Sequence, residues 1–358
     1  MIVVGGGAMG LSTAWWLARG GRSVVLLERF ERGHVRGSSH GSARVFRLAY
    51  PDSQYVDLAV RAQRLWAELE SESGTSLLTR TGGIDMGHPK AVRDVAMALD
   101  RSSVPYEFMD PSAGAERYSG MRFETPLLYQ SEGGRLDAEL TLTTLQTQAE
   151  KHGAAIKFSE GLEAIEAKDD RLTVSTSQDT YRAPVGVFAV GSWITPILGP
   201  HLALPPIRIS KEQPAHFTRI DEAAVWPIFL DHTAARSAAG PANFAAYGLN
   251  VLGGVKVGLH GTGLVVDPET RDFEPDQRGL DDLSRYVEHW LPGLDPTPHS
   301  ITSCLYTSTS TTDFILDRRG PFVVGSACSG HGFKFTPVIG QILAGLAEGE
   351  SSPNCFWI

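Results

Sequence analysis

The stretch IVVGGGAMG, residues 2–10, opens the chain and decides its fold. Its three β-branched residues predict a short buried strand, and the apolar periodicity of residues 11–19 predicts a helix directly after the glycines. A second apolar run at 23–27 predicts another strand, which ends at Glu28. Strand, glycine turn, helix, strand and acid follow one another in the order typical of a dinucleotide-binding unit.

Three glycines in this stretch have the spacing of the dinucleotide fingerprint. Gly5 is expected to make the tight turn, Gly7 to let the backbone approach a pyrophosphate, and Gly10 to let helix and strand pack closely. The pyrophosphate would lie at the helix N-terminus, where free N–H groups favour negative charge. Glu28 would accept a hydrogen bond from a ribose hydroxyl. A glycine turn without a ligand is the alternative, but all the flanking elements agree with a nucleotide site.

Composition excludes several classes of protein. The chain has 358 residues, 42% of them hydrophobic, which is enough for two domains. A net charge of −9 argues against nucleic acid or an anionic membrane as a partner. We find neither a signal peptide nor an 18-residue apolar run. Three cysteines, Cys304, Cys328 and Cys355, make no disulfide framework and fit a reducing compartment, so we expect a cytoplasmic protein.

A basic segment follows the nucleotide-binding unit. It contains His40, Arg44 and Arg47 and ends at Tyr50. The two arginines are three residues apart, so on a helical turn they would share a face. This favours an anionic ligand, with a solvated basic turn as the alternative.

A strand is predicted near residue 256 because apolar and polar residues alternate there. Two sets of side chains alternate along it: Val255, Val257 and Leu259 on one face, and Lys256, Gly258 and His260 on the other. The bare glycine between a cation and an imidazole would let a flat ring lie close to the backbone. The alternative is a solvent-exposed strand face.

A second anion site is predicted near the C-terminus. The glycine-rich loop 329–335 includes Gly330, Gly332 and Lys334. Thr336 is expected to cap the helix that follows, with Pro337 at its first position. The sequence has no Cys and His spacing typical of a metal site. Earlier in the chain, Asp137 is expected to cap a helix.

Three of these segments resemble the monomeric sarcosine oxidase and N-methyltryptophan oxidase family of FAD-dependent amine oxidases. Residues 40–50 resemble its His-Gly-x-x-Arg-x-x-Arg-x-x-Tyr segment. Residues 304–307 resemble its Cys-x-Tyr-Thr motif, and residues 330–335 resemble its closing flavin and substrate loop. The resemblance runs from Gly5 to about Gly349.

The resemblance implies roles in holding the cofactor. FAD would bind the N-terminal glycine loop and be linked through its 8α-methyl group to the sulfur of Cys304. His40 and Arg44 would pack against one flavin face. Gly330 and Gly332 would belong to the closing flavin loop.

The resemblance also implies roles in binding and oxidising the substrate. Arg47 and Lys334 would hold the substrate carboxylate, and Lys334 would also face the flavin. Lys256 would lie near flavin N5, where oxygen is reduced. His260 would be the imidazole on the substrate side, and Tyr247 would flank the pocket.

Two departures from the family pattern leave the substrate open. The spacing between Tyr247 and Lys256 is shorter than in sarcosine oxidase, and Ser42 stands where the family commonly has Asp. The resemblance implies oxidation of a small secondary-amine amino acid to an imine, with O2 reduced to H2O2. N-methyltryptophan, pipecolate and fructosyl amino acids are alternative substrates. An NAD-dependent dehydrogenase and a non-enzymatic flavin-binding protein are the alternative classes.

The expected fold is α/β with an α+β character, in which a Rossmann-like FAD-binding domain is joined to a domain with an antiparallel sheet. Residues 1–80, 130–203 and 303–358 would form the discontinuous FAD-binding domain. Residues 81–129 and 204–302 would form the substrate domain. We expect a monomer whose partners are the amino acid substrate and O2.

Overall fold

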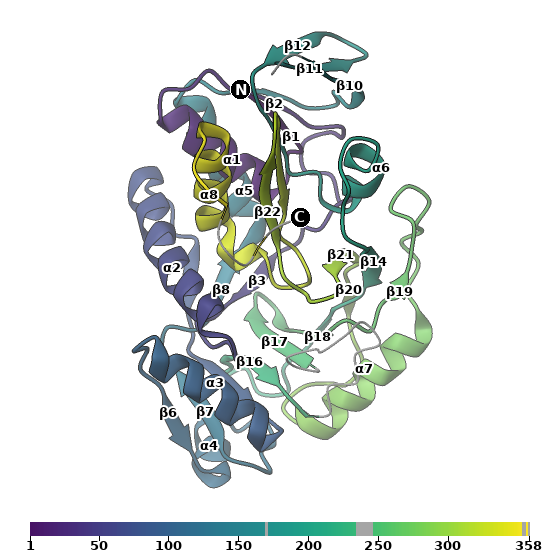
Figure 1. Cartoon of the computed structure of the whole chain (residues 1–358). Coiled ribbons are helices and arrows are strands. Elements are labelled where there is room, and N and C mark those ends of the chain that lie inside the picture. Colours follow the sequence, from purple (N-terminus) through teal and green to yellow (C-terminus); the bar gives the residue numbers. More distant parts are fainter. Residues whose placement is uncertain (169–170, 234–245, 353–355, 357–358) are drawn as a thin grey trace.

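The computed structural model describes residues 1–168, 171–233, 246–352 and 356 (Figure 1). At its centre is a six-stranded sheet in which β1 lies between β13 and β2. The pairings are parallel except at the edge, where β22 runs antiparallel to β23. In spatial order the strands are β22 (Ile315–Arg319), β23 (Phe322–Ser326), β13 (Gly186–Phe188), β1 (Ile2–Val4), β2 (Val25–Leu27) and β9 (Ala155–Lys157).

The central strands are buried on both faces because each face has its own cover. Val3 belongs to the core shared with the helices, whereas Ile2 and Val4 pack in a cluster with Leu172. This division follows the period of two in a strand. The second cover is the antiparallel sheet of β10 (Leu162–Lys168), β11 (Arg171–Thr176) and β12 (Thr180–Ala183), together with α6 (Ile194–Leu198).

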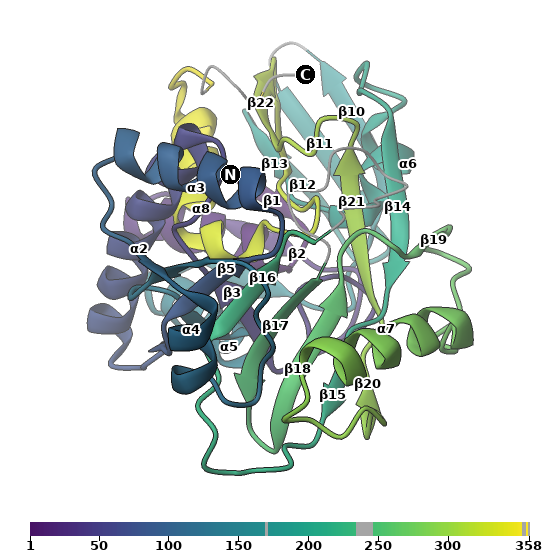
Figure 2. The same cartoon turned by 90° about the horizontal axis from the view of Figure 1, so that it is seen from below.

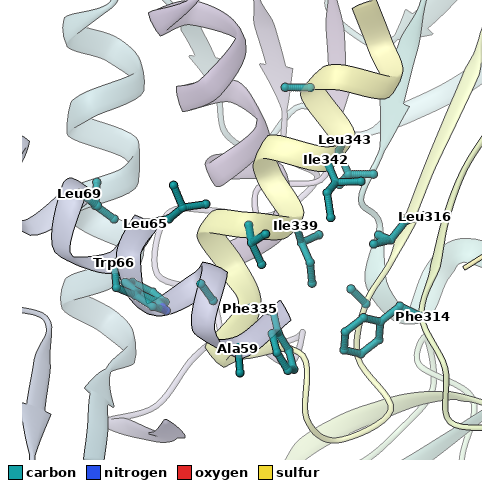
Figure 3. Close-up of a cluster of buried hydrophobic side chains, with 14 of the residues drawn as sticks. Ala59, Leu65, Trp66, Leu69, Phe314, Leu316, Phe335, Ile339, Ile342 and Leu343 are labelled. Carbon is teal, nitrogen blue, oxygen red and sulfur yellow. The ribbon is translucent and has the colours of Figure 1, made fainter. Parts of the chain in front are cut away.

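Helices α1 (Ala8–Arg19), α5 (Ala138–Lys151) and α8 (Thr336–Glu348) pack on one side of the central sheet (Figure 1). The predicted cap of α5 is confirmed, because the Asp137 carboxylate accepts a hydrogen bond from Leu140 N. Helix α2 (Ser53–Ser73) packs outside α8. Figure 3 shows Trp66 and Leu69 of α2 in the same cluster as Ile339 and Leu343 of α8. An apolar stripe on each helix therefore joins residues about 270 positions apart in sequence.

An eight-stranded sheet forms the other half of the molecule. Helix α7 (Gln277–Trp290) lies along one of its faces, where Leu283 and Val287 pack with Val255 and Val257 (Figure 2). All pairings are antiparallel except β5 with β16. In spatial order the strands are β20 (Ser300–Ile301), β15 (Ala215–Phe217), β18 (Gly254–Leu259), β17 (Ala246–Val251), β16 (Ile228–Asp231), β5 (Gly83–Met86), β7 (Leu127–Gln130) and β6 (Glu107–Met109).

Two small antiparallel sheets lie between these halves. One has β14 (Ile207–Glu212) between β19 (Leu264–Val265) and β21 (Cys304–Thr309). The other has β8 (Gly134–Asp137) between β3 (Ala43–Phe46) and β4 (Leu78–Arg80). The remaining helices are α3 (Pro89–Arg101), α4 (Pro111–Arg117) and the 3-10 turns η1 (Gly191–Trp193) and η2 (Phe333–Phe335). In the described ranges, none of the helices combines the length and apolar composition that a membrane crossing requires.

The predicted fold class is confirmed, with a mixed sheet covered by helices and a second, largely antiparallel sheet. The helical turn at Arg44 is wrong, because residues 43–46 form β3 and Arg44 pairs with Leu136 of β8. Thr336 does not cap α8 but is its first residue, because η2 runs directly into that helix. The domain boundaries stay a prediction, and Cys355 lies outside the described residues.

Candidate active site

A cavity of about 980 Å³ lies between the central sheet and the eight-stranded sheet. One end is formed by the residues that directly follow β1, β2, β13 and β23, at the carboxyl edge of the sheet. Open α/β sheets bind their ligands at this edge. Most of the predicted site residues line the cavity: Gly5, Gly7, Glu28, His40, Arg44, Arg47, Tyr247, Lys256, Cys304, Gly330, Gly332 and Lys334.

The glycine turn after β1 is tight and closely packed. Gly5 has a φ of 104°, which favours glycine. Gly10 lies behind the cavity wall, where a Cβ would be 1.8 Å from the Gly5 carbonyl oxygen. The Glu28 carboxylate accepts hydrogen bonds from Gly6 N at 2.6 Å and Phe30 N at 2.9 Å. Strand, turn and helix are therefore locked together where a pyrophosphate would bind.

The loop over the cavity is held by hydrogen bonds to two different strands, β3 and β21. The Arg44 guanidinium, on β3, donates to the carbonyls of Ser38 at 2.8 Å and His40 at 2.5 Å. Ser38 Oγ donates to the Leu305 carbonyl at 2.6 Å. The Nε2 atom of His40 is buried without a hydrogen-bond partner among the described residues. Burial, and then the charge of Arg44, lower the pKa of His40 to about 4, so its ring is neutral at pH 7.

Two thiols face the cavity from neighbouring segments. Cys304 is buried at the start of β21, and Cys328 lies in the loop after β23. Burial raises the pKa of Cys304, and the charges of Arg44 and Lys256 act against that rise. Cys328 Sγ accepts a hydrogen bond from Thr307 N at 3.4 Å. The charge of Arg44 also acts against the rise in the pKa of Cys328, whereas that of Lys256 acts on Cys304 but not on Cys328.

Lys256 is buried, so the alternative of a solvent-exposed strand face is wrong. Its side chain is 4% exposed, and Nζ lies 3.4 Å from the Ala43 carbonyl of β3. Burial, followed by the charge of Arg44, lowers the pKa of Lys256 to about 7. The ammonium and the amine are thus both accessible near neutral pH.

The space beside Gly258 is filled by a tyrosine ring of the protein, not by the flat ligand ring that the sequence predicted. It pairs with Tyr247 across β17 and β18. A Cβ on Gly258 would lie 2.7 Å from the Tyr247 hydroxyl and ring. The bare glycine therefore makes room for the tyrosine, which itself lines the cavity.

Two buried cations meet at one tyrosine. The Lys334 ammonium donates to the Tyr50 hydroxyl at 2.9 Å, and the Arg47 guanidinium lies 4.0 Å from the centre of the same ring. Arg47 also donates to the Ala49 carbonyl. Burial and the charge of Arg47 hold the pKa of Lys334 well below its usual value. Such a pair of cations would be stabilised by an anion bound between them.

His260 does not line the cavity, unlike the other predicted substrate residues. It lies behind Gly330, whose φ is 77° and where a Cβ would be 2.6 Å from the imidazole. Its ring centre is 5.4 Å from that of Tyr306. Burial, then the charges of Arg47 and Lys334, lower the pKa of His260 to about 3. The imidazole is therefore neutral and close to the two cations.

Several residues contribute to the site although the sequence did not identify them. Ser39 Oγ accepts a hydrogen bond from Ala8 N at the start of α1. Tyr50 was noted as the end of a motif but given no role. Asp85 lies on β5 and contacts Arg47, and His232 contacts Asp85. The only sequence signal for Asp85 was an acid between two apolar residues of a short strand.

Comparison with known proteins assigns the chain to a family. A sequence profile described as FAD dependent oxidoreductase matches residues 1–346. The chain belongs to this family. It is 31% identical to the monomeric sarcosine oxidase of Bacillus sp. (strain NS-129), over 97% of this chain and 92% of that protein. It is 33% identical to the peroxisomal sarcosine oxidase of Homo sapiens, over 97% and 91%.

A solved structure gives the same relationship. The chain superimposes on NikD, described as an unusual amino acid oxidase essential for nikkomycin biosynthesis, with a TM-score of 0.86. The two are 28% identical over 98% of this chain and 94% of NikD. The chain is thus an FAD-dependent amine oxidase of the sarcosine oxidase family. The NAD-dependent and non-enzymatic alternatives are excluded by this membership.

The residues of the cavity fit FAD. The turn at Gly5 and the N-terminus of α1 suit a pyrophosphate, and the buried His40 Nε2 leaves a hydrogen-bonding atom for a ligand. The volume is at the upper end of the range for ligand pockets, which is about 300–1,000 Å³. Within the described ranges, no group of three or more His, Cys, Asp or Glu side chains is arranged to bind a metal ion.

Proposed function

We propose that the protein oxidises a small secondary-amine amino acid of the sarcosine type, with O2 as electron acceptor and H2O2 as product. The observation that carries this proposal is the pair of buried cations, Arg47 and Lys334, that both contact Tyr50. A carboxylate bound there would make charge-assisted hydrogen bonds in a water-poor site. It would therefore be held in a fixed orientation toward the rest of the cavity.

Bound FAD would supply the electron sink for the hydride equivalent lost from the C–H bond beside the amine nitrogen, and the route of two electrons to oxygen. Gly5, Gly7, Gly10 and Glu28 would hold its nucleotide half, with Gly330 and Gly332 in the loop near its ring. Arg47 and Lys334 make the site positive, which disfavours a protonated substrate amine, and His260 beside them stays neutral. Tyr247 limits the width of the pocket. Lys256 supplies an ammonium that stabilises negative charge developing on oxygen.

The proposal is tested by measuring peroxide release across a panel of amines at equal concentration. Sarcosine, N-methyltryptophan, pipecolate and a fructosyl amino acid cover the candidate substrates, and N-methylbenzylamine has a secondary amine but no carboxylate. We expect sarcosine to have the highest kcat/KM. Equal turnover of N-methylbenzylamine would contradict the proposed carboxylate site. A higher kcat/KM for another amino acid would make that amino acid the substrate and leave the reaction type unchanged.

We further propose that FAD is covalently attached to Cys304. This thiol lines the cavity and has Arg44 and Lys256 as neighbouring cations, which favour a thiolate. Acid denaturation should leave the yellow colour on the wild-type chain and release it from Cys304→Ala. Cys328→Ala is the matched control, because Cys328 faces the same cavity, and it should keep the flavin attached. Free flavin from the denatured wild-type protein would contradict the link.

We also propose that the enzyme is a cytoplasmic monomer, in line with its few cysteines and ordinary acidic composition. Size-exclusion chromatography with light scattering measures the mass directly. A single species near 38.7 kDa is expected, and a dimer at micromolar concentration would contradict it.

A further inference from the structure

Behind the proposed carboxylate site, Arg47 contacts two buried residues that do not line the cavity, Asp85 directly and His232 through Asp85. Asp85 Oδ1 lies 2.8 Å from His232 Nε2 and 3.7 Å from Arg47 Nη1. Each of the three residues is no more than 3% exposed. Arg47 lines the cavity, whereas Asp85 and His232 do not. The carboxylate therefore contacts Arg47 from the side away from the ligand.

The eight-stranded sheet explains how these groups meet. Asp85 on β5 is paired with Leu230 on β16, and Leu230 with Tyr247 on β17. Residues paired across a sheet point to the same face, so Asp85 shares the face that borders the cavity. His232 follows β16, and its amide donates to the Met86 carbonyl at 2.8 Å. The backbone of Asp85 is paired with β16 on one side and with Leu128 of β7 on the other, which sets the position of the carboxylate.

Arg47 has supports other than this carboxylate. Its guanidinium donates to the Ala49 carbonyl and lies over the Tyr50 ring. Loss of the Asp85 charge would therefore leave the guanidinium facing the cavity, while an amide at position 85 still offers an oxygen. The change is one of charge. Without a neighbouring carboxylate, a buried Arg binds another anion more tightly.

We propose that Asp85, held by His232, is the resident counter-ion of Arg47 and weakens the grip of Arg47 on carboxylate ligands. It is a positioning residue that acts through Arg47, and the inference rests on the proposed carboxylate site. The resident anion keeps the buried guanidinium compensated when no ligand is bound. It also lets an anionic product leave, since ligand and Asp85 share one positive group.

The test measures the Kd of methoxyacetate, which has the shape and carboxylate of sarcosine but no amine to oxidise. Binding is followed by the visible absorbance of the FAD-containing enzyme and by the rise in Tm. Removing one charge this close to the ligand should tighten Kd of Asp85→Asn by about tenfold. Methoxyacetate should accordingly raise Tm more in Asp85→Asn than in the wild type. Asp85→Glu keeps the charge and should stay within about twofold of the wild type.

Asp231→Asn is the matched control. Asp231 is the next buried acid of this sheet, but its carboxylate binds Tyr286 at 2.9 Å rather than Arg47. This variant should lose stability and keep the wild-type Kd. An unchanged or weaker Kd in Asp85→Asn would overturn the inference. If Asp85→Asn does not fold, Asp85→Ser takes its place. If neither folds while Asp85→Glu does, Asp85 has a structural role and the inference is overturned as well.

Arg47→Ala separates the inference from the proposed function. It should weaken methoxyacetate binding by at least about tenfold, the value of one charge-assisted hydrogen bond. If Arg47→Ala bound methoxyacetate as the wild type does, the carboxylate site itself would be wrong. If Arg47→Ala lost binding and Asp85→Asn did not gain it, only the role of Asp85 would be wrong.

Discussion

The residue with the most finely balanced charge is Lys256. Burial brings its pKa to about 7, and its amine reaches the Ala43 carbonyl rather than a carboxylate. A buried cation with no carboxylate partner among the described residues is well placed to stabilise negative charge that appears only during a reaction. On our proposal, Arg47 and Lys334 bind the substrate carboxylate. Lys256 is therefore expected to serve the reaction with oxygen.

Lys256→Met keeps most of the side-chain volume and removes the charge. It should slow the reoxidation of reduced enzyme by O2 by at least about 100-fold, as expected when a preorganised charge is taken from a developing anion. Anaerobic reduction by substrate should fall much less. Stopped-flow absorbance separates the two half-reactions. If reoxidation were unchanged and reduction collapsed, Lys256 would be a substrate-binding residue.

The same residue predicts a pH dependence. Its folded pKa of about 7 lies below its usual 10.5, so the ammonium is present below pH 7 and is lost as the pH rises through that value. The rate constant for reoxidation should fall over the same interval. The Lys256→Met variant supplies the baseline and should show no such step. A reoxidation rate that rose with pH in the wild type would contradict the ammonium role.

At the scale of the element, the unit that joins β1 to α1 depends on close contact. A Cβ at Gly10 would lie 1.8 Å from the Gly5 carbonyl, so Gly10→Ala must displace the turn that would hold the pyrophosphate. We expect a loss of about 1–3 kcal/mol in the free energy of unfolding, or more, as for other overpacked sites. FAD content per chain, measured by absorbance, should fall with it.

Gly20→Ala is the matched control for this prediction. Gly20 ends the same helix with a φ of −74°, and its nearest neighbours would be 3.4 Å from a Cβ. This variant should keep full FAD content and stability. Normal FAD content in Gly10→Ala would show that the turn is more plastic than its contacts indicate.

At the scale of the whole molecule, one cavity is lined by segments from Val4 to Lys334. A ligand bound there should stabilise the entire fold, by about 4 kcal/mol at a concentration 1,000 times Kd. Cys304→Ala, which on our proposal binds FAD reversibly, should therefore gain several degrees in Tm as FAD is added. NAD at the same concentration is the control and should give no gain. A low-temperature transition unaffected by FAD would mean that one part unfolds independently of the site.

The sequence by itself determined the elements whose signals are local. The glycine turn of β1 and α1, the acid at Glu28 and the Asp137 cap of α5 each depend on a few neighbouring residues. Local hydrogen bonds and backbone conformation decide such features, so a short window of sequence contains them. The motifs at Cys304 and Lys334 also identified two walls of the site, because their spacing within each segment is distinctive.

Only the tertiary structure decided how distant segments share a site. Residues 43–46 became a strand because β8, about 90 positions later, supplied its partner. Lys256 is buried because β3 covers its face, and Gly258 accommodates Tyr247 rather than a ligand. Asp85 on β5 and Arg47, directly after β3, come from different sheets and meet only in the folded chain. Burial and ion pairing of this kind depend on contacts between segments far apart in sequence, which no local pattern of residue types specifies.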